Sequence, residues 1–250
     1  MPERSYTSDI AFTPAVKAIQ SRKGSRNGYA RMEQGGGWQS EITPELKSFI
    51  AQQTSVYLAT ASADGQPYIQ HRGGPAGFLH VLDARRIAFV DFAGNRQYIS
   101  SGNLAENPKA HLFLMDYAHR QRIKIWGAAR VVEGDTALTA QLMPKDYQAR
   151  AEQVIVFTVK AWDANCPQHI PVRLEAKDVQ RALDVRDARI LELEHRFRGD
   201  RHPAVPSGPG DALHVHADDH AVAELGRAPA RGRAAHGHGC PPRRRRVRRG

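Results

Sequence analysis

Short apolar segments separated by turn residues follow one another between Ser55 and Asp163, and they constrain the fold more than any other feature. There are seven of them: VYLATAS, PYIQHR, FLHVLD, RRIAFVDF, HLFLMDY, RIKIWGAARVVE and QVIVFTVKAWD. Asp64-Gly65, between the first and the second, is a strong hairpin signal. In the sixth, apolar residues alternate with more polar ones, which is typical of an antiparallel strand. Strands at this spacing favour an antiparallel β-barrel over alternating strands and helices.

The segments around this β region predict helices. Thr13-Pro14 and Thr43-Pro44 each place an N-cap residue before a proline suited to the first helical position. We therefore expect helices at 12–22 and 42–53, and further helices at 98–106, 136–150 and 177–198. Near-heptad apolar spacing in the last is typical of a helix that packs on the barrel or on a second copy.

The sequence divides into four parts. We expect an N-terminal arm with one short helix, poorly ordered overall, at 1–41, a barrel domain at 42–176, a C-terminal helix at 177–198 and a tail at 199–250. The tail has no Phe, Tyr, Trp, Ile or Met, so it lacks the apolar surface needed to offset its ordering entropy. We expect it to be disordered, and its composition suggests a frame-shifted reading of a GC-rich gene.

The charge and the cysteine content limit the classes of function that the chain could have. The chain carries a net charge of +10, and ten arginines against five acidic residues place +5 of it in the tail. A nucleic-acid-binding arm or a metal-binding His tract is therefore the alternative reading of the tail. Cys166 and Cys240 lie in unrelated contexts, and no Cys/His spacing indicates a metal site. The first residues do not read as a signal peptide and no apolar run could span a bilayer, so we expect a cytoplasmic protein.

One stretch, FAGNRQYISSGNLAENPKA at 92–110, points to a binding site. An apolar strand ends near Gly94, and Asn95, Arg96 and Gln97 then precede a predicted helix. A helix N-terminus exposes free N–H groups, and a neighbouring Arg can hold a phosphate with two hydrogen bonds. The stretch therefore predicts either an anion site or a turn and helix cap with no other role.

The order of four motifs resembles a known family. DGQP at 64–67, FVDFAGNRQY at 89–98, LAENPKAHLFL at 104–114 and RQRIKIWGAARVVE at 120–133 resemble the pyridoxamine 5′-phosphate oxidase-like superfamily of FMN-binding split barrels. The resemblance covers roughly 43–163. It implies a mainly β fold with peripheral helices, built on a six-stranded antiparallel split barrel. It also implies a homodimer with FMN in a cleft between the subunits.

The resemblance also implies which residues contact the cofactor. Three blocks supply them, namely the strand after the Asp-Gly turn, the strand-turn-helix block and the RQ block. The residues are Gln70, His71, Arg72, Gly73, Asp91, Asn95, Arg96, Gln97 and Gln121. A flavin ring also needs an aromatic or apolar wall, which Trp162 could supply. Gln97 stands where the family typically has Lys. Each assignment has a structural alternative: Arg96 as a surface cap, Gln121 as a solvated turn residue, Trp162 as core, with Trp126 the other candidate for an aromatic wall.

The function implied is an FMN-dependent oxidoreductase acting on a small molecule, with a nicotinamide cofactor as a reductant to test. The alternatives are a flavin carrier or sensor without turnover, and a nucleic-acid binder acting through the tail. A deazaflavin or haem could replace FMN. The family's late substrate block is absent, with Arg173 its only candidate remnant, so the substrate and the catalytic residues stay unassigned. The WDANCPQHIPVR loop at 162–173 is either a rigid corner or a cover for the flavin.

Overall fold

The structure is a computed structural model that describes residues 5–164 and 167–199. It divides into two compact units, Met1–Leu174 and Glu175–Gly250. The expectations for Cys166, for Cys240 and for the tail beyond Gly199 lie outside the described residues.

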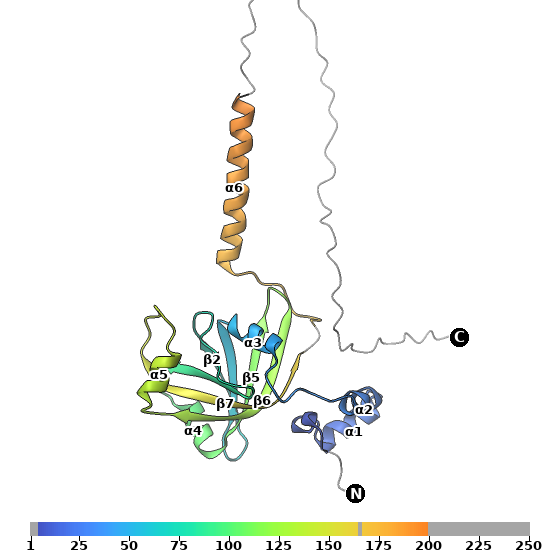
Figure 1. Cartoon of the computed structure of the whole chain (residues 1–250). Helices are drawn as coiled ribbons and strands as arrows, with labels where there is room; N and C mark the ends of the chain where they lie inside the picture. The colour runs from blue at the N-terminus through green and yellow to red at the C-terminus, as the bar shows by residue number, and fades with distance from the viewer. Residues whose placement is uncertain (1–4, 165–166, 200–250) are drawn as a thin grey trace, which may run out of the picture. The chain divides into compact units, whose positions relative to one another are not determined.

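Seven antiparallel strands form one curved sheet in the first unit (Figure 1). They are β1 (Ser55–Ala61), β2 (Pro67–Gly73), β3 (His80–Val81), β4 (Arg86–Phe92), β5 (Lys109–Asp116), β6 (Gln121–Val132) and β7 (Ala151–Ala164). Their order in the sheet is β2-β1-β5-β6-β7-β4-β3. The predicted split-barrel fold is confirmed.

The strand count and the closure of the barrel differ from the prediction. FLHVLD contributes only the two-residue β3, because Phe78 and Leu79 leave the ladder and are buried in the core instead. This short strand brings the number of strands to seven rather than six. β2 and β3 form the two edges, and no ladder joins them among residues 5–164, so the sheet is not closed.

Alternation along the strands builds the core. Leu58 of β1 pairs with Leu112 of β5, which pairs in turn with Ile125 of β6, and all three are fully buried. Because side chains alternate along a strand, the residues between them face outward. Fully burying one such side chain contributes about 1.5–3 kcal/mol, so rows of this kind hold the sheet in one register.

Three helices pack on the sheet. They are α3 (Pro44–Ala51), α4 (Ile99–Glu106) and α5 (Thr136–Leu142). Thr43 caps α3 as predicted, because its hydroxyl accepts from the Leu46 N–H at 3.3 Å. α4 lies against β1, β2 and β6, and α5 against β4 and β7. α5 ends well before the predicted residue 150, because Met143 is extended ahead of Pro144.

The N-terminal arm contains more structure than the sequence predicted. It forms a 3₁₀ helix, η1 (Thr7–Ile10), and two α-helices, α1 (Pro14–Arg22) and α2 (Arg26–Gln34). The predicted α1 is confirmed, and the arm contains η1 and α2 as well, rather than the single short helix predicted. One contact within α2 and one distant contact stabilise these elements: Arg26 pairs with the buried Glu33 of the same helix, and Trp38 stacks on Trp126 of β6 with ring centroids 4.6 Å apart.

The second unit contains α6 (Ala176–Gly199), a helix of 24 residues. It matches the predicted helix at 177–198 within one residue at each end. Every side chain of α6 from residue 176 to 198 is exposed. Among the described residues, no helix combines the length and the apolar character that a membrane span needs.

Candidate cofactor site

The turn between β4 and α4 has an unusual backbone. Arg96 and Tyr98 both have left-handed φ angles, 60° and 54°. Such conformations cost about 1–3 kcal/mol each and gather at ligand sites. Asn95 steadies the turn, because its Oδ1 accepts from the Gln97 N–H at 3.3 Å. Tyr98 is the N-cap of α4 and provides no side-chain cap, so its side chain leaves the first N–H groups of the helix free.

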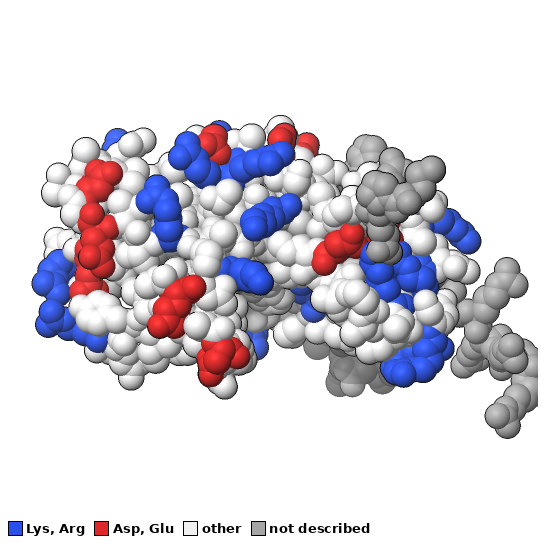
Figure 2. All heavy atoms as spheres, turned by 90° about the horizontal axis from the view of Figure 1, so that it is seen from below, with Lys and Arg blue, Asp and Glu red and all other residues white. Residues whose placement is uncertain are grey.

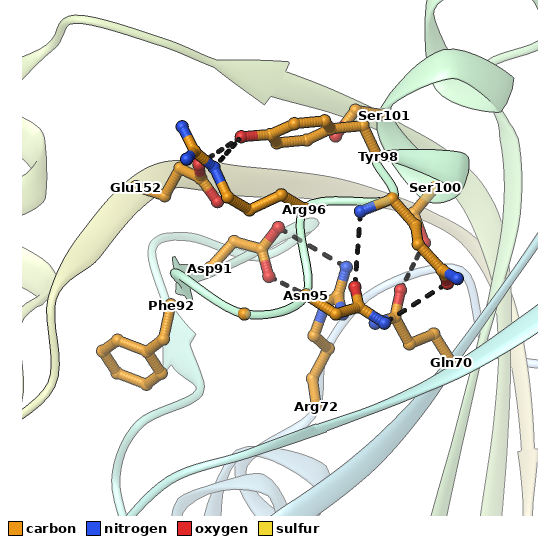
Figure 3. A pocket seen from close by; sticks show the side chains of 12 residues that line it. Gln70, Arg72, Asp91, Phe92, Asn95, Arg96, Tyr98, Ser100, Ser101 and Glu152 are labelled. Carbon is orange, nitrogen blue, oxygen red and sulfur yellow. Dashed lines mark hydrogen bonds and ion pairs between the residues drawn. The ribbon is translucent and has the colours of Figure 1, made fainter.

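Beneath this turn lies a small polar cavity, which we call the Arg96 pocket (Figure 3). Its volume is about 50 Å³. Residues from β2, β4, the turn, α4 and β7 line it: Gln70, Arg72, Asp91, Phe92, Gly94, Asn95, Arg96, Gln97, Tyr98, Ser100, Ser101 and Glu152. The structure thus brings six of the ten predicted site residues together.

Arg96 is held at the rim of the pocket through Tyr98. Its Nε donates to the Tyr98 hydroxyl at 3.3 Å, and that hydroxyl donates to Glu152 Oε1 at 2.6 Å. The hydrogen bond with Tyr98, together with the negative charges nearby, raises the pKa of the Arg96 guanidinium above its usual value. No carboxylate among the described residues forms an ion pair with Arg96, so its two Nη groups remain available to an anion.

A buried polar network forms the floor of the pocket. Arg72 Nε lies 2.9 Å from Asp91 Oδ1, and Arg72 Nη2 donates to Asp91 Oδ2 at 3.4 Å. Gln153 Nε2 donates to the same Oδ2 and to Ser101 Oγ, both at 2.9 Å. Arg72 and Asp91 therefore form a buried ion pair with two nitrogen–oxygen contacts, in which the Nε–H is poorly aligned with the carboxylate.

Alternation in β2 separates the residues predicted there. Gln70 and Arg72 share one side of the strand and line the Arg96 pocket, where Gln70 Oε1 accepts from Ser100 at 3.2 Å. His71 lies between them and forms a 2.7 Å hydrogen bond with the Ser55 hydroxyl. Consecutive residues of a strand point to opposite faces, so His71 does not line the Arg96 pocket.

A larger cavity of about 570 Å³ adjoins the Arg96 pocket. Arg72, Asp91 and Phe92 line both. Six residues line the larger cavity but not the Arg96 pocket: His71, Gly73, Gly74, Pro75, Val90 and Tyr147. Phe92 and Tyr147 pack with ring centroids 5.2 Å apart. The two cavities together therefore set polar and cationic groups beside an aromatic wall.

Gln121 and Trp162 lie away from the Arg96 pocket of their own chain. Gln121 lines a separate cavity of about 570 Å³ with Phe49 and His119. Trp162 packs against the core, and its Nε1 donates to the Glu41 carbonyl at 2.8 Å. Within one copy of the chain, these two side chains therefore do not complete the site.

The described part of the loop at 162–173 lies near the hairpin of β5 and β6. Arg120 donates to the Pro167 carbonyl at 3.3 Å, and the Arg173 guanidinium sits over the Tyr117 ring at 4.6 Å. Neither Pro167 nor Arg173 lines the Arg96 pocket or the adjoining cavity.

Several residues of the site were missed from the sequence. Ser101 had a readable signal, since a hydroxyl in the first turn of a helix after the AGNRQY turn is well placed for an anion. It accepts from Gln153, so its own O–H stays free to donate. Glu152 and Tyr147 had no such signal, because both come to the site from more than 50 residues away. Glu152 lies in β7, which pairs with β4, and Tyr147 precedes β7 and packs on Phe92.

The charges of the Arg96 pocket cancel within the chain. Arg72 and Arg96 contribute two positive charges, and Asp91 and Glu152 two negative ones. Asp91 is neutralised locally by Arg72, whereas Glu152 reaches Arg96 only through the Tyr98 hydroxyl. The attraction for an anion therefore rests on Arg96 and on the open N-terminus of α4. The described residues contain no cluster of three or more His, Cys, Asp or Glu side chains suited to a metal.

Comparison with known proteins identifies the family. The family model described as pyridoxamine 5′-phosphate oxidase matches residues 42–166, half of the chain. The chain therefore belongs to the pyridoxamine 5′-phosphate oxidase family, and the resemblance inferred from the sequence is confirmed. No curated protein matches it.

Solved structures similar to the chain include three bacterial proteins. HupZ of Group A Streptococcus is 21% identical over 53% of this chain and 99% of its own, with a TM-score of 0.40. A putative pyridoxamine 5′-phosphate oxidase from Lactobacillus delbrueckii is 22% identical over 50% and 95%, with a TM-score of 0.38. An FMN-binding protein from Syntrophomonas wolfei is 14% identical over 61% and 95%, also with a TM-score of 0.38.

Proposed function

We propose that the protein binds FMN at the Arg96 pocket and the adjoining cavity, and acts as a flavin-dependent oxidoreductase on a small molecule. The observation that carries the proposal is the strained turn, which presents Arg96 beside the uncapped N-terminus of α4. A guanidinium and free helix N–H groups are the two standard partners of a phosphate dianion in proteins.

The chemistry of the surrounding residues fits the rest of the cofactor. The amides of Gln70, Asn95 and Gln97 suit phosphate and ribityl oxygens. Phe92 and Tyr147 offer an aromatic wall in a cavity whose volume is in the usual range of small-molecule sites. When bound, FMN would supply two-electron redox chemistry, and the protein would hold it and limit its contact with water.

Gln121 and Trp162 would reach the flavin only from a second copy of the chain. Both lie away from the Arg96 pocket of their own copy, so a site that uses them needs a homodimer. We therefore include the homodimer in the proposal, with each cofactor held between the two copies.

The charges on the face that Figure 2 shows give no support to a nucleic-acid binder built on that face of the barrel. Figure 2 shows one face of the molecule, on which Lys and Arg are interspersed with Asp, Glu and uncharged residues rather than joined in one basic patch. Nucleic-acid sites usually gather their cations on one face or along one groove.

The absorption spectrum of the purified protein tests the proposal. We expect flavin bands, and release of FMN in a ratio near one per chain on denaturation. Anaerobic addition of NADH or NADPH should bleach the bands within seconds to minutes if the protein turns over. Bound FMN that neither nucleotide reduces would indicate a carrier or sensor. Haem or deazaflavin bands, or no cofactor after incubation with FMN, would contradict the FMN assignment.

Replacing Glu152 by Gln should strengthen FMN binding. The change removes a negative charge close to Arg96 and keeps an oxygen that can accept from Tyr98. Since the site is open to water, we expect the Kd for FMN to fall by a factor of about two to five. Riboflavin, which lacks the phosphate, is the control ligand. The same change in Kd for both flavins would show that Glu152 acts on the fold and not on the phosphate.

A further inference from the structure

An apolar stripe runs the length of α6. Successive positions of the stripe are separated by three and four residues in turn, which is the heptad spacing of a coiled coil. One position is charged, Arg186. The others are apolar: Ala176, Val179, Leu183, Ile190, Leu193 and Phe197.

Within the second unit the stripe has no partner, because α6 is the one element that the structure describes there. Leu193 is 36% exposed and Phe197 69% exposed, and all other side chains of residues 176–198 are exposed as well. Helices of this length owe most of their stability to burial of an apolar face rather than to helix propensity. A surface that covers the stripe is therefore needed.

The charges beside the stripe identify that surface. With Leu183 and Ile190 at heptad position a, Asp187 and Glu194 fall at e, and Arg189 at g. In a parallel pair, Arg189 of one helix faces Glu194 of the other, which are opposite charges. In an antiparallel pair, e faces e and g faces g, so Asp187 would meet Glu194 and like charges would repel.

We propose that α6 forms a parallel two-stranded coiled coil with α6 of a second copy of this chain. By symmetry, the pair makes two equivalent contacts, each between Arg189 of one helix and Glu194 of the other. Arg186 occupies a d position, where the two copies of this residue lie side by side, so it costs stability and its long side chain has to carry the charge outward to water. The coiled coil requires neither the FMN site nor its contacts.

Position-specific disulfide formation tests the pairing. Leu193 lies on the stripe, and Leu191 lies two residues before it on the opposite side of the helix. In the full chain, with Cys166 and Cys240 replaced by Ser, Leu193→Cys and Leu191→Cys form a matched pair. After mild oxidation we expect most of the L193C protein to become a linked dimer, and at least about tenfold less of L191C. No linking at 193, or equal linking at both, would overturn the proposal.

Charge reversal tests the parallel orientation. In the L193C background, Arg189→Glu and Glu194→Arg should each slow linking several-fold, and the double reversal should restore it. Within one helix, Arg189 pairs with Glu192 at 2.5 Å and Glu194 with Arg198 at 3.6 Å. The double reversal breaks both of these pairs. Linking that stays slow in the double variant would mean that the charges act within one helix, and the parallel contact would be refuted.

Discussion

Replacing Gly127 by Ala is expected to lower the free energy of unfolding by about 3 kcal/mol or more. Gly127 lies in β6 beside a register shift in its pairing with β7. A Cβ there would lie well inside van der Waals contact of the Thr158 carbonyl oxygen, and 2.6 Å from a ring carbon of Phe157. Backbone in the middle of a sheet cannot move aside, so the two longest strands would have to separate locally. Chemical denaturation of both proteins measures the change.

Gly102→Ala is the matched control for that prediction. Gly102 lies inside α4, and a Cβ there would meet no atom within 4 Å apart from the backbone of its own helix. Because Ala has the higher helix propensity, we expect this variant to be as stable as the wild type or more stable by up to about 1 kcal/mol. Equal destabilisation by both substitutions would show that the close contact at Gly127 is not the cause.

Replacing Asp91 by Ala is expected to cost about 3–5 kcal/mol of stability, the usual effect of leaving one half of a buried ion pair alone. The Asp91 and Arg72 side chains are only 9% and 15% exposed. The substitution also removes the acceptor of Gln153, which links β4 to β7 and, through Ser101, to α4. Thermal and denaturant unfolding should both report the loss.

A second substitution separates the ion pair from simple packing. The double variant Asp91→Ala with Arg72→Met removes both charges and keeps an unbranched apolar side chain in the place of Arg72. It should be more stable than Asp91→Ala alone, because no buried charge is left unpaired. If the double variant is the less stable of the two, Arg72 stabilises the floor of the pocket independently of Asp91.

Local signals in the sequence predicted the framework well. Thr13-Pro14 and Thr43-Pro44 each begin a helix, and Gly65 adopts the positive φ of 92° that its turn requires. The family resemblance also directed attention to Arg72, Asp91 and Arg96, which the fold brings to one pocket. Caps, turns and strand alternation depend on neighbours in the chain, so they can be read from the sequence directly.

Features that depend on distant contacts were not predictable in this way. One example is the contact between the N-terminal arm and β6, in which Trp38 stacks on Trp126, a residue that lies 88 positions later in the chain. Glu152 reaches the pocket because β7 pairs with β4 in one particular register. Likewise, only the three-dimensional structure shows that Gln121 lies in a different cavity from Arg96.

The central claim is that Arg96 and the N-terminus of α4 hold the phosphate of FMN. Titration of the apoprotein with FMN and with riboflavin, for the wild type and Arg96→Ala, tests it most directly. Because the substitution removes a charge-assisted contact to a dianion, FMN affinity should fall by about ten- to hundredfold. Riboflavin affinity should stay within about twofold. Arg96→Lys should recover part of the loss, since a point charge replaces a planar fork. Equal weakening of both flavins, or no weakening of either, would contradict the claim and leave the turn as a helix cap alone.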